Sequence, residues 1–252
     1  KKKNSMRILV TGVSSYIGRY LPKSFIKKKI NIIGISRKNP NIKSKYFFWE
    51  KKDLSAPNKI KINKNIDFII HVAGNARRDK NNVLDYIQGN IINSYNLAKI
   101  AKKLNPKCIF YLSSREIYGD INTKILSEKN DIINPIVYGQ SKYLVEKIFE
   151  QSFKTISLRL SAVLGVGTHG WISHVYKSLK ANKKIEIINT NFNNFIHVND
   201  VFSIIYSFMK DKVFYSDQFN VCCSNIIKSK KVIEIMKKSM KSKSKIVSKK
   251  NK

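Results

Sequence analysis

Short apolar runs alternate with segments of helical period between residues 6 and 160, and no other feature constrains the fold as strongly. The strand-like runs lie at residues 6–13, 30–36, 66–73, 108–113 and 155–160. Apolar residues at helical spacing lie between them, most clearly in two stretches, residues 83–104 and 138–152. Apolar strands joined by helices are typical of βαβ units, whose parallel strands are covered on both faces. The pattern predicts an α/β fold with a doubly wound parallel sheet.

The pattern of alternating strands and helices weakens after about residue 165, and we expect a smaller lobe there. Its expected elements are helices at 171–180 and 201–209, strands at 185–188, 195–198 and 219–222, and the start of a helix at 232–236. We predict a first domain of residues 1–165, to which residues 195–210 return, and a lobe of residues 166–252. Because residues 237–252 contain eight Lys and few apolar residues, we expect a frayed or disordered basic tail.

The chain is strongly basic, with 49 Lys and Arg against 16 Asp and Glu and a formal net charge of +33. Such a charge is common in nucleic-acid-binding proteins. However, 42 of the cations are Lys and seven are Arg, whereas Arg is the residue suited to bidentate recognition of phosphates and bases. The lysines are also spread along the whole chain. The composition therefore favours a solvated basic surface over a nucleic-acid partner.

The composition also argues against several other classes of protein. No run of about 18 apolar residues occurs, so we predict no transmembrane helix, and no apolar signal-like region follows the first lysines. The three cysteines, Cys108, Cys222 and Cys223, have neither the number of a disulfide framework nor the spacing of metal ligands. We therefore expect a cytoplasmic protein without a metal site.

A glycine-containing turn, TGVSSYIG at residues 11–18, follows the first predicted strand. Gly12 permits a tight turn there and Gly18 lets the next helix approach the strand, while Ser15 stands at the middle position. At this place in a Rossmann-type sheet, backbone amides and a helix N-terminus can bind a pyrophosphate. The loop predicts dinucleotide binding by Gly12, Ser14, Ser15, Tyr16, Ile17 and Gly18.

The end of the second predicted strand indicates which dinucleotide is preferred. An acidic residue there would bind an unphosphorylated ribose, but the chain has Ser36 and Arg37 followed by Lys38. A hydroxyl group and two cations suit a 2′-phosphate. We therefore favour NADP(H), with NAD as the alternative.

Several further motifs occur in a fixed order and resemble those of one family. The matching segments are residues 11–18, Asp53-Leu54, residues 71–74 (HVAG), Asn90 with Asn96-Leu97, residues 111–119 (YLSSREIYG), residues 138–142 (YGQSK), Leu158-Arg159, residues 195–201 (FIHVNDV) and residues 219–221 (FNV). Together they resemble extended short-chain dehydrogenases/reductases, of the NAD-dependent epimerase/dehydratase type that acts on nucleotide sugars. This resemblance implies a Rossmann-type sheet with a small C-terminal substrate-binding lobe.

The resemblance also implies roles for particular residues. It places Ser114, Tyr138 and Lys142 in a catalytic set, with Lys142 also holding the nicotinamide ribose. It adds further cofactor-binding residues, namely Asp53, Leu54, Val72, Ala73, Gly74 and Asn90. The spacing agrees with this chemistry, because residues four apart share one face of a helix. A neighbouring ammonium favours the phenolate form of a tyrosine, which can then exchange a proton with a sugar oxygen.

The type of reaction rests on fewer residues. In dehydratases of the family a Glu at the position of Glu116 removes a carbon-bound proton, but the preceding acid is Arg115 here, and an Arg cannot protonate a leaving hydroxyl group. We therefore favour a 4-keto reductase or an epimerase over a dehydratase that uses Glu116. A Rossmann-fold binding protein without catalysis is the remaining alternative, although the Ser-Tyr-Lys set argues against it.

The substrate side departs from the family. The Arg that usually begins the segment at residues 193–201 is Asn193 here, which removes a contact to the nucleotide diphosphate. Arg77, Arg78 and Arg159 are candidate replacements because guanidinium groups suit phosphates, although Arg159 can equally be structural. Trp171 is a candidate for stacking on a base or sugar, and a core position is the alternative. We expect a nucleotide-sugar substrate, a role in surface-polysaccharide synthesis and a homodimer, as the resemblance implies.

Overall fold

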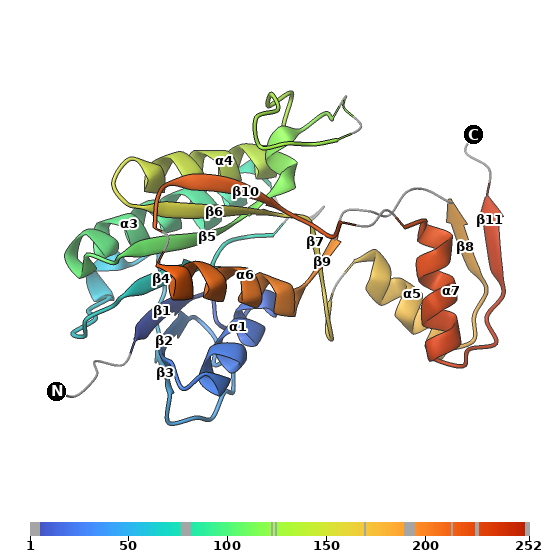
Figure 1. Cartoon of the computed structure of the whole chain (residues 1–252), viewed down its shortest axis with the longest axis horizontal. Helices are drawn as coiled ribbons and strands as arrows, with labels where there is room; N and C mark the ends of the chain where they lie inside the picture. The colour runs from blue at the N-terminus through green and yellow to red at the C-terminus, as the bar shows by residue number, and fades with distance from the viewer. Residues whose placement is uncertain are drawn as a thin grey trace. The chain divides into compact units, whose positions relative to one another are not determined.

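The computed structural model describes residues 6–76, 82–121, 123, 125–168, 170–188, 195–212, 214–224 and 227–249 (Figure 1). Two compact units make up the chain. Unit 1 comprises Lys1–Leu160 and Val198–Val221, and unit 2 comprises Ser161–His197 and Cys222–Lys252. Among the described residues, no helix is both long and apolar enough to cross a membrane.

Unit 1 is built on a seven-stranded sheet in which every pair of neighbouring strands is parallel. Its strands are β1 (Arg7–Thr11), β2 (Asn31–Ser36), β3 (Phe47–Lys51), β4 (Phe68–His71), β5 (Cys108–Ser114), β6 (Thr155–Leu160) and β10 (Asp217–Val221). The order β3-β2-β1-β4-β5-β6 is that of a Rossmann sheet, and β10 extends it beyond β6. The predicted α/β Rossmann class is therefore confirmed.

Helices cover both faces of this sheet (Figure 1). They are α1 (Tyr16–Lys27), α2 (Val83–Tyr86), a π-helical segment (Ile87–Ile92), α3 (Asn93–Leu104), α4 (Val137–Glu150) and α6 (Val198–Asp211), with short 3₁₀ turns η1 (Pro57–Lys59) and η3 (Arg115–Tyr118). On one face Leu97 and Phe149 pack with Tyr111 of β5. On the other, Phe208 of α6 contacts the ring of Phe110. Successive residues of β5 thus enter opposite layers, which explains its unbroken apolar sequence.

Two features of unit 1 differ from the expectations. The edge strand β3 was not predicted, because its residues are half-buried or exposed and form no continuous apolar run. The helical stretch at 83–104 is interrupted by the π-helical segment, in which Asn90 is buried.

The described residues of unit 2 form two helices and two small parallel sheets. Its elements are β7 (Ala162–Leu164) paired with β9 (Phe195–His197), β8 (Ile185–Ile188) paired with β11 (Ile246–Lys249), α5 (Trp171–Lys180) and α7 (Ser229–Ser239). Val175, Leu179, Ile185, Ile187 and Ile233 form its core.

The prediction of a frayed or disordered tail after residue 237 is wrong for the described part of that segment. Ser242 Oγ donates to the carbonyl of Leu179, and Ser244 is fully buried. Ile246 packs on the unit 2 core and pairs with Ile185. A few small and apolar residues therefore anchor a lysine-rich segment whose charged groups remain in solvent.

Candidate active site

The turn between β1 and α1 requires its two glycines. Gly12 has a positive φ of +69°, and a Cβ atom there would lie 2.7 Å from Cα of Ala73. A Cβ atom on Gly18 would lie 2.1 Å from the carbonyl oxygen of Gly12. Ser15 caps α1, its Oγ accepting from the Gly18 amide at 3.1 Å, and the first turn contains no acidic residue. The positive end of α1 is therefore suited to an anionic group.

A buried hydrogen-bond chain fixes the neighbouring strand end. Thr11 Oγ1 accepts from the amides of Val72 and Ala73, which leaves its proton for His71 Nδ1 at 2.7 Å. Nε2 of His71 lies 2.8 Å from Ser94 Oγ. Burial, and secondarily the charge of Lys142, lowers the pKa of His71 to about 3. His71 is thus a neutral structural residue, and Val72–Gly74 are held beside the glycine turn.

The adenosine side of the predicted cofactor site contains Ser36, Arg37, Asp53 and Leu54. Ser36 Oγ donates to the Lys38 carbonyl and accepts from Trp49 Nε1 at 3.0 Å. Its single proton is therefore engaged, and the exposed side chains of Arg37 and Lys38 are the remaining groups for a 2′-phosphate. Asp53 Oδ1 accepts from the Ser55 amide. The buried Leu54 is held through its carbonyl, which accepts from Asn96.

Asn90, predicted to bind the cofactor, holds three segments together. Its Oδ1 accepts from the amide of Asn75 at 2.6 Å. Its Nδ2 donates to Ser141 Oγ at 2.9 Å, and Ser141 Oγ donates to the Tyr138 carbonyl at 2.7 Å. A Cβ atom on Gly74 would lie 2.8 Å from Asn90 Oδ1. The π-helical segment therefore connects the loop after β4 with the first turn of α4.

The predicted catalytic residues lie where β5, η3 and α4 meet. Ser114 ends β5, and its Oγ accepts from the amide of Glu116. Lys142 Nζ donates to the carbonyl of Leu112 at 2.8 Å and lies 5.9 Å from the ring centroid of Tyr138. A Cβ atom on Gly139 would lie 2.1 Å from the carbonyl oxygen of Glu116. A glycine therefore lets the start of α4, with Tyr138, come directly against η3.

The electrostatics of the site are dominated by the burial of Lys142, which is 8% exposed. Desolvation lowers the pKa of its ammonium to about 8, against the opposing effect of Glu146. Lys142 Nζ lies 4.8 Å from the ring centroid of Tyr111. Burial raises the pKa of Tyr111, so its phenol stays neutral.

The predicted substrate residues lie in different surroundings. Arg115 Nε is 3.8 Å from Glu116 Oε1, and both side chains are partly exposed. Trp171 begins α5 in unit 2 and is exposed. Arg77 and Arg78 lie outside the described residues.

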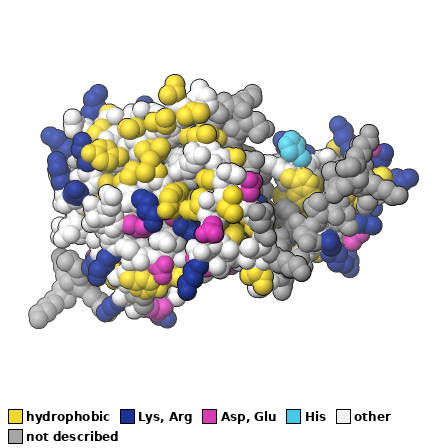
Figure 2. Space-filling model, turned by 90° about the horizontal axis from the view of Figure 1, so that it is seen from above, with side chains coloured by type: hydrophobic (Ala, Val, Ile, Leu, Met, Phe, Trp, Pro, Cys, Tyr) yellow, Lys and Arg dark blue, Asp and Glu magenta, His cyan; other side chains and the backbone are white. Residues whose placement is uncertain are grey.

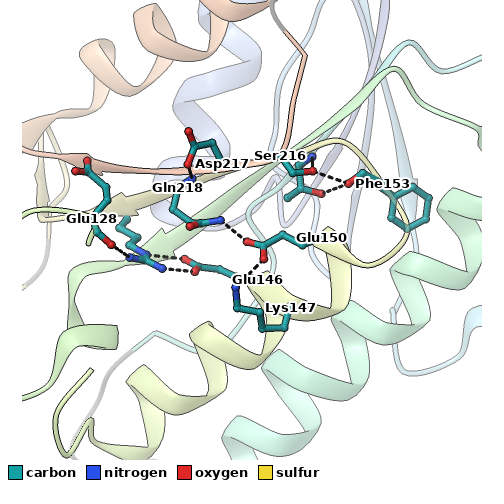
Figure 3. Close-up of polar contacts among 10 residues, drawn as sticks. Glu128, Glu146, Lys147, Glu150, Phe153, Ser216, Asp217 and Gln218 are labelled. Atoms are coloured by element: carbon teal, nitrogen blue, oxygen red, sulfur yellow. Dashed lines mark hydrogen bonds and ion pairs between the residues drawn. The ribbon is translucent and has the colours of Figure 1, made fainter. Parts of the chain in front are cut away.

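Among the predicted substrate residues, Arg159 has the most clearly defined contacts. These contacts favour a structural role over phosphate binding. Its Nε and Nη2 donate to Glu146 at 3.2 and 2.8 Å, and Nη1 donates to Tyr118 Oη at 2.8 Å. The Glu146 side chain is fully buried and that of Arg159 is 5% exposed. Figure 3 shows Glu146 pointing from α4 toward this network, to which the Glu128 carbonyl also belongs. The guanidinium is therefore engaged by protein groups.

Sequence reasoning missed Glu146, Tyr118 and Ser141. A signal for Glu146 was present, because it lies four residues after Lys142 on the helix face that also carries Val145 and Phe149. A charged residue on a buried face requires a partner. Among the described residues, no group of three or more His, Cys, Asp or Glu side chains could hold a metal ion.

Comparisons with known proteins identify a family, curated relatives and solved structures that are similar to this chain. The model of the NAD dependent epimerase/dehydratase family matches residues 8–222. A GDP-6-deoxy-D-talose 4-dehydrogenase from Aggregatibacter actinomycetemcomitans is 30% identical over 86% of this chain and 74% of its own length. A CDP-abequose synthase from Salmonella muenchen is 27% identical over 95% of this chain and 83% of its own. The solved UDP-Glc/GlcNAc 4-epimerase from Campylobacter jejuni has a TM-score of 0.83 at 23% identity and covers 98% of this chain and 88% of its own.

Proposed function

Because the chain belongs to the NAD dependent epimerase/dehydratase family, we propose that it is an oxidoreductase or epimerase that moves a hydride at a carbon of a nucleotide-linked sugar. The observation that carries this proposal is the placement of Tyr138 and the buried Lys142 on α4, against the strand end that bears Ser114. Both the proton-transfer group and the cation that assists it are present. This constellation argues against a binding protein without catalysis.

The residues of the glycine turn fit a dinucleotide, because Gly12 and Gly18 leave no room for side chains and the start of α1 offers its amides to an anion. A bound nicotinamide would supply or accept the hydride. Tyr138 exchanges the proton at the sugar oxygen, and the Lys142 ammonium stabilises negative charge that develops on the phenol oxygen. Ser114 donates a hydrogen bond to the same sugar oxygen.

Tyr138→Phe tests this mechanism, because it removes only the oxygen that exchanges the proton. We expect turnover to fall by about 10²–10⁴-fold, while cofactor affinity, measured by fluorescence titration, stays within about threefold, since less than 1 kcal/mol of binding free energy is removed. Tyr143→Phe, on the same helix, is the matched control and keeps full activity. Wild-type turnover in Tyr138→Phe would refute the assignment.

We propose NADP(H) as the preferred cofactor, with NAD as the alternative that the family name favours. The preference depends on the cations Arg37 and Lys38, because Ser36 has committed its proton to the Lys38 carbonyl. We expect Arg37→Ala to weaken NADPH binding by roughly tenfold or more, the value of a charge-assisted hydrogen bond, and to leave NADH binding unchanged. Equal effects on both cofactors, measured by calorimetry, would contradict the preference.

The reaction we favour is reduction of a 4-keto sugar or epimerisation at carbon 4. Two relatives support this choice, since one is named a 4-dehydrogenase of a GDP-linked 6-deoxy sugar and one solved neighbour a 4-epimerase. Arg115 lies beside Glu116, and a guanidinium cannot act as the acid that dehydration needs. Incubation with a panel of nucleotide sugars and either cofactor, read by product mass, separates the outcomes. Reduction adds two hydrogens, epimerisation leaves the mass unchanged and dehydration removes water.

We also propose that the enzyme is a homodimer, as the sequence resemblance implies, and that it is cytoplasmic, as its few cysteines favour. Exposed apolar side chains on α2, α3 and α4 support a contact surface there; these include Leu84, Tyr95 and Leu144. Figure 2, which views unit 1 from the side of α3 and α4 in Figure 1, shows apolar side chains gathered on that face. Light scattering tests this, and a monomer at micromolar concentration would contradict it.

A further inference from the structure

A buried ion pair lies one helical turn from Lys142. Glu146 is fully buried and Arg159 is 4% exposed, and two hydrogen bonds join them. Desolvating two charges costs several kcal/mol per ion, and replacing a buried pair by packed apolar side chains is often neutral or stabilising. Stability alone is therefore a poor explanation for this pair.

The pair connects α4 to the strands beneath it. Arg159 on β6 lies opposite Ser113 on β5, next to Leu112, whose carbonyl accepts from Lys142 Nζ. Lys142 and Glu146 are four residues apart on α4 and share one face. The bond between Glu146 and Arg159 thus fixes α4 over the strands in a position from which Lys142 can reach the Leu112 carbonyl on β5.

The same guanidinium holds the segment that follows Ser114. Nη1 of Arg159 donates to Tyr118 Oη, and Tyr118 ends η3. Tyr118 Oη donates in turn to Asn220 Oδ1 on β10 at 2.8 Å. Asn220 also fixes the loop before α4, because its amide donates to Glu128 Oε1 at 2.6 Å. One cation therefore joins both segments that bear the proposed catalytic residues.

We propose that Glu146 and Arg159 are positioning residues, which set the spacing between the Lys142 ammonium, the Tyr138 phenol and the Ser114 strand end. This inference rests on the proposed function of those three groups. In the described part of the chain, the titratable groups that face the ammonium are Tyr138 and Glu146 on its own helix, Tyr111 on β5 and His71 on β4. Arg159 balances the charge of Glu146, so that Lys142 bonds to the Leu112 carbonyl instead of turning toward Glu146.

Two single variants change the charge facing Lys142 in opposite directions. Glu146→Gln removes the carboxylate that raises the pKa of Lys142, so that pKa falls below about 8. Arg159→Met leaves the carboxylate without its counter-ion, so the pKa of Lys142 rises. The titration is followed by NMR of the cofactor-free protein labelled with ¹⁵N-lysine, and by the basic limb of the kcat/KM pH profile. Opposite shifts show that the charges of the pair face the ammonium, and the positioning role itself is measured by kcat in the double variant described next.

A double variant, Glu146→Met with Arg159→Met, keeps the test valid where a single variant fails to fold. It leaves no unpaired buried charge, and we expect it to fold with a melting temperature near that of the wild type. We expect its kcat to fall by roughly ten- to hundredfold, because a misplacement of about 1 Å can cost that much. Lys147→Met, which removes the neighbouring partly exposed pair with Glu150 (Figure 3), is the matched control and keeps the wild-type kcat and pH profile.

A folded double variant with wild-type kcat would overturn the inference. Failure of the proposed function gives a different result. In that case the wild type turns over no nucleotide sugar, or Tyr138→Phe keeps its activity, whereas the substrate-free titration of Lys142 still responds to the charges of Glu146 and Arg159.

Discussion

Lys142→Met is expected to stabilise the cofactor-free protein at neutral pH, although the same change should abolish activity. Burial lowers the pKa of Lys142 from 10.5 to about 8. Since one pKa unit corresponds to about 1.4 kcal/mol, holding the charged lysine in place costs the folded state about 3 kcal/mol at pH 7. Met is of similar size and carries no charge. It forfeits the hydrogen bond to the Leu112 carbonyl, worth about 1 kcal/mol, so the net gain is about 2 kcal/mol.

The direction in which stability changes with pH follows from the lowered pKa of Lys142. Between about pH 8 and 10.5 the unfolded chain keeps the proton on Lys142 and the folded protein releases it, so wild-type stability rises with pH through this window. The stability that Lys142 contributes is complete above pH 10.5 and is lost as the pH falls through 8. The advantage of Lys142→Met should therefore be largest at about pH 6.5 and should vanish by about pH 9.5.

Urea unfolding measures this difference directly. The chain has two Trp residues, Trp49 in unit 1 and Trp171 in unit 2, so Trp49 fluorescence in a Trp171→Phe background reports on the unit that contains Lys142. Lys147→Met is the control, because the pKa of Lys147 is raised and its charge is constant over this range. A difference between wild type and Lys142→Met that does not change with pH, or a variant less stable at pH 7, would refute the reasoning.

Three further predictions concern other parts of the molecule. His71 should stay neutral from about pH 5 to 8, since its pKa is lowered to about 3; an NMR titration midpoint within that range would contradict the buried chain through Thr11 and Ser94. Gly139→Ala should lower stability by about 1–3 kcal/mol and reduce kcat, because its Cβ would meet the Glu116 carbonyl; wild-type kcat and melting temperature would refute this. Ile233→Ala, fully buried in unit 2, should cost about 2–5 kcal/mol in urea unfolding followed by circular dichroism; a loss below about 0.5 kcal/mol would show that the site is not packed as described.

The sheet could be predicted because its central strands bury both faces. β1, β4 and β5 are therefore continuous apolar runs, which are visible without tertiary information. The edge strand β3 lacks this signature, since two of its five residues are exposed. The anchored segment around Ser244 also escaped prediction, because its burial depends on contacts with Leu179 and Ser178, which lie far away along the chain.

The candidate site was predictable where chemistry depends on spacing along the chain, as for Tyr138 and Lys142 on one helix face. It was not predictable where the role of a residue depends on partners that lie far away in the sequence. Arg159 is equally suited to a phosphate or a carboxylate, and its pairing with Glu146 decides between them. Ser36 is equally suited to a 2′-phosphate, and its bond to Trp49 on the neighbouring strand is invisible in the sequence.

The π-helical segment makes one region of the chain unusually sensitive to length. A π-helix accommodates one more residue per hydrogen-bonded turn than an α-helix, so deleting a single residue within Ile87–Ile92 would convert the segment into regular α-helix. Because the extra residue is held within a single turn, the helical segments on either side would keep their orientation, and only the bulge that carries Asn90 would be lost. The Asn90 amide would leave Ser141 while α3 kept its packing on the sheet. An insertion or deletion of one codon here would therefore abolish activity while the protein still folds. The number of residues in this segment is constrained more strictly than the identity of its apolar residues.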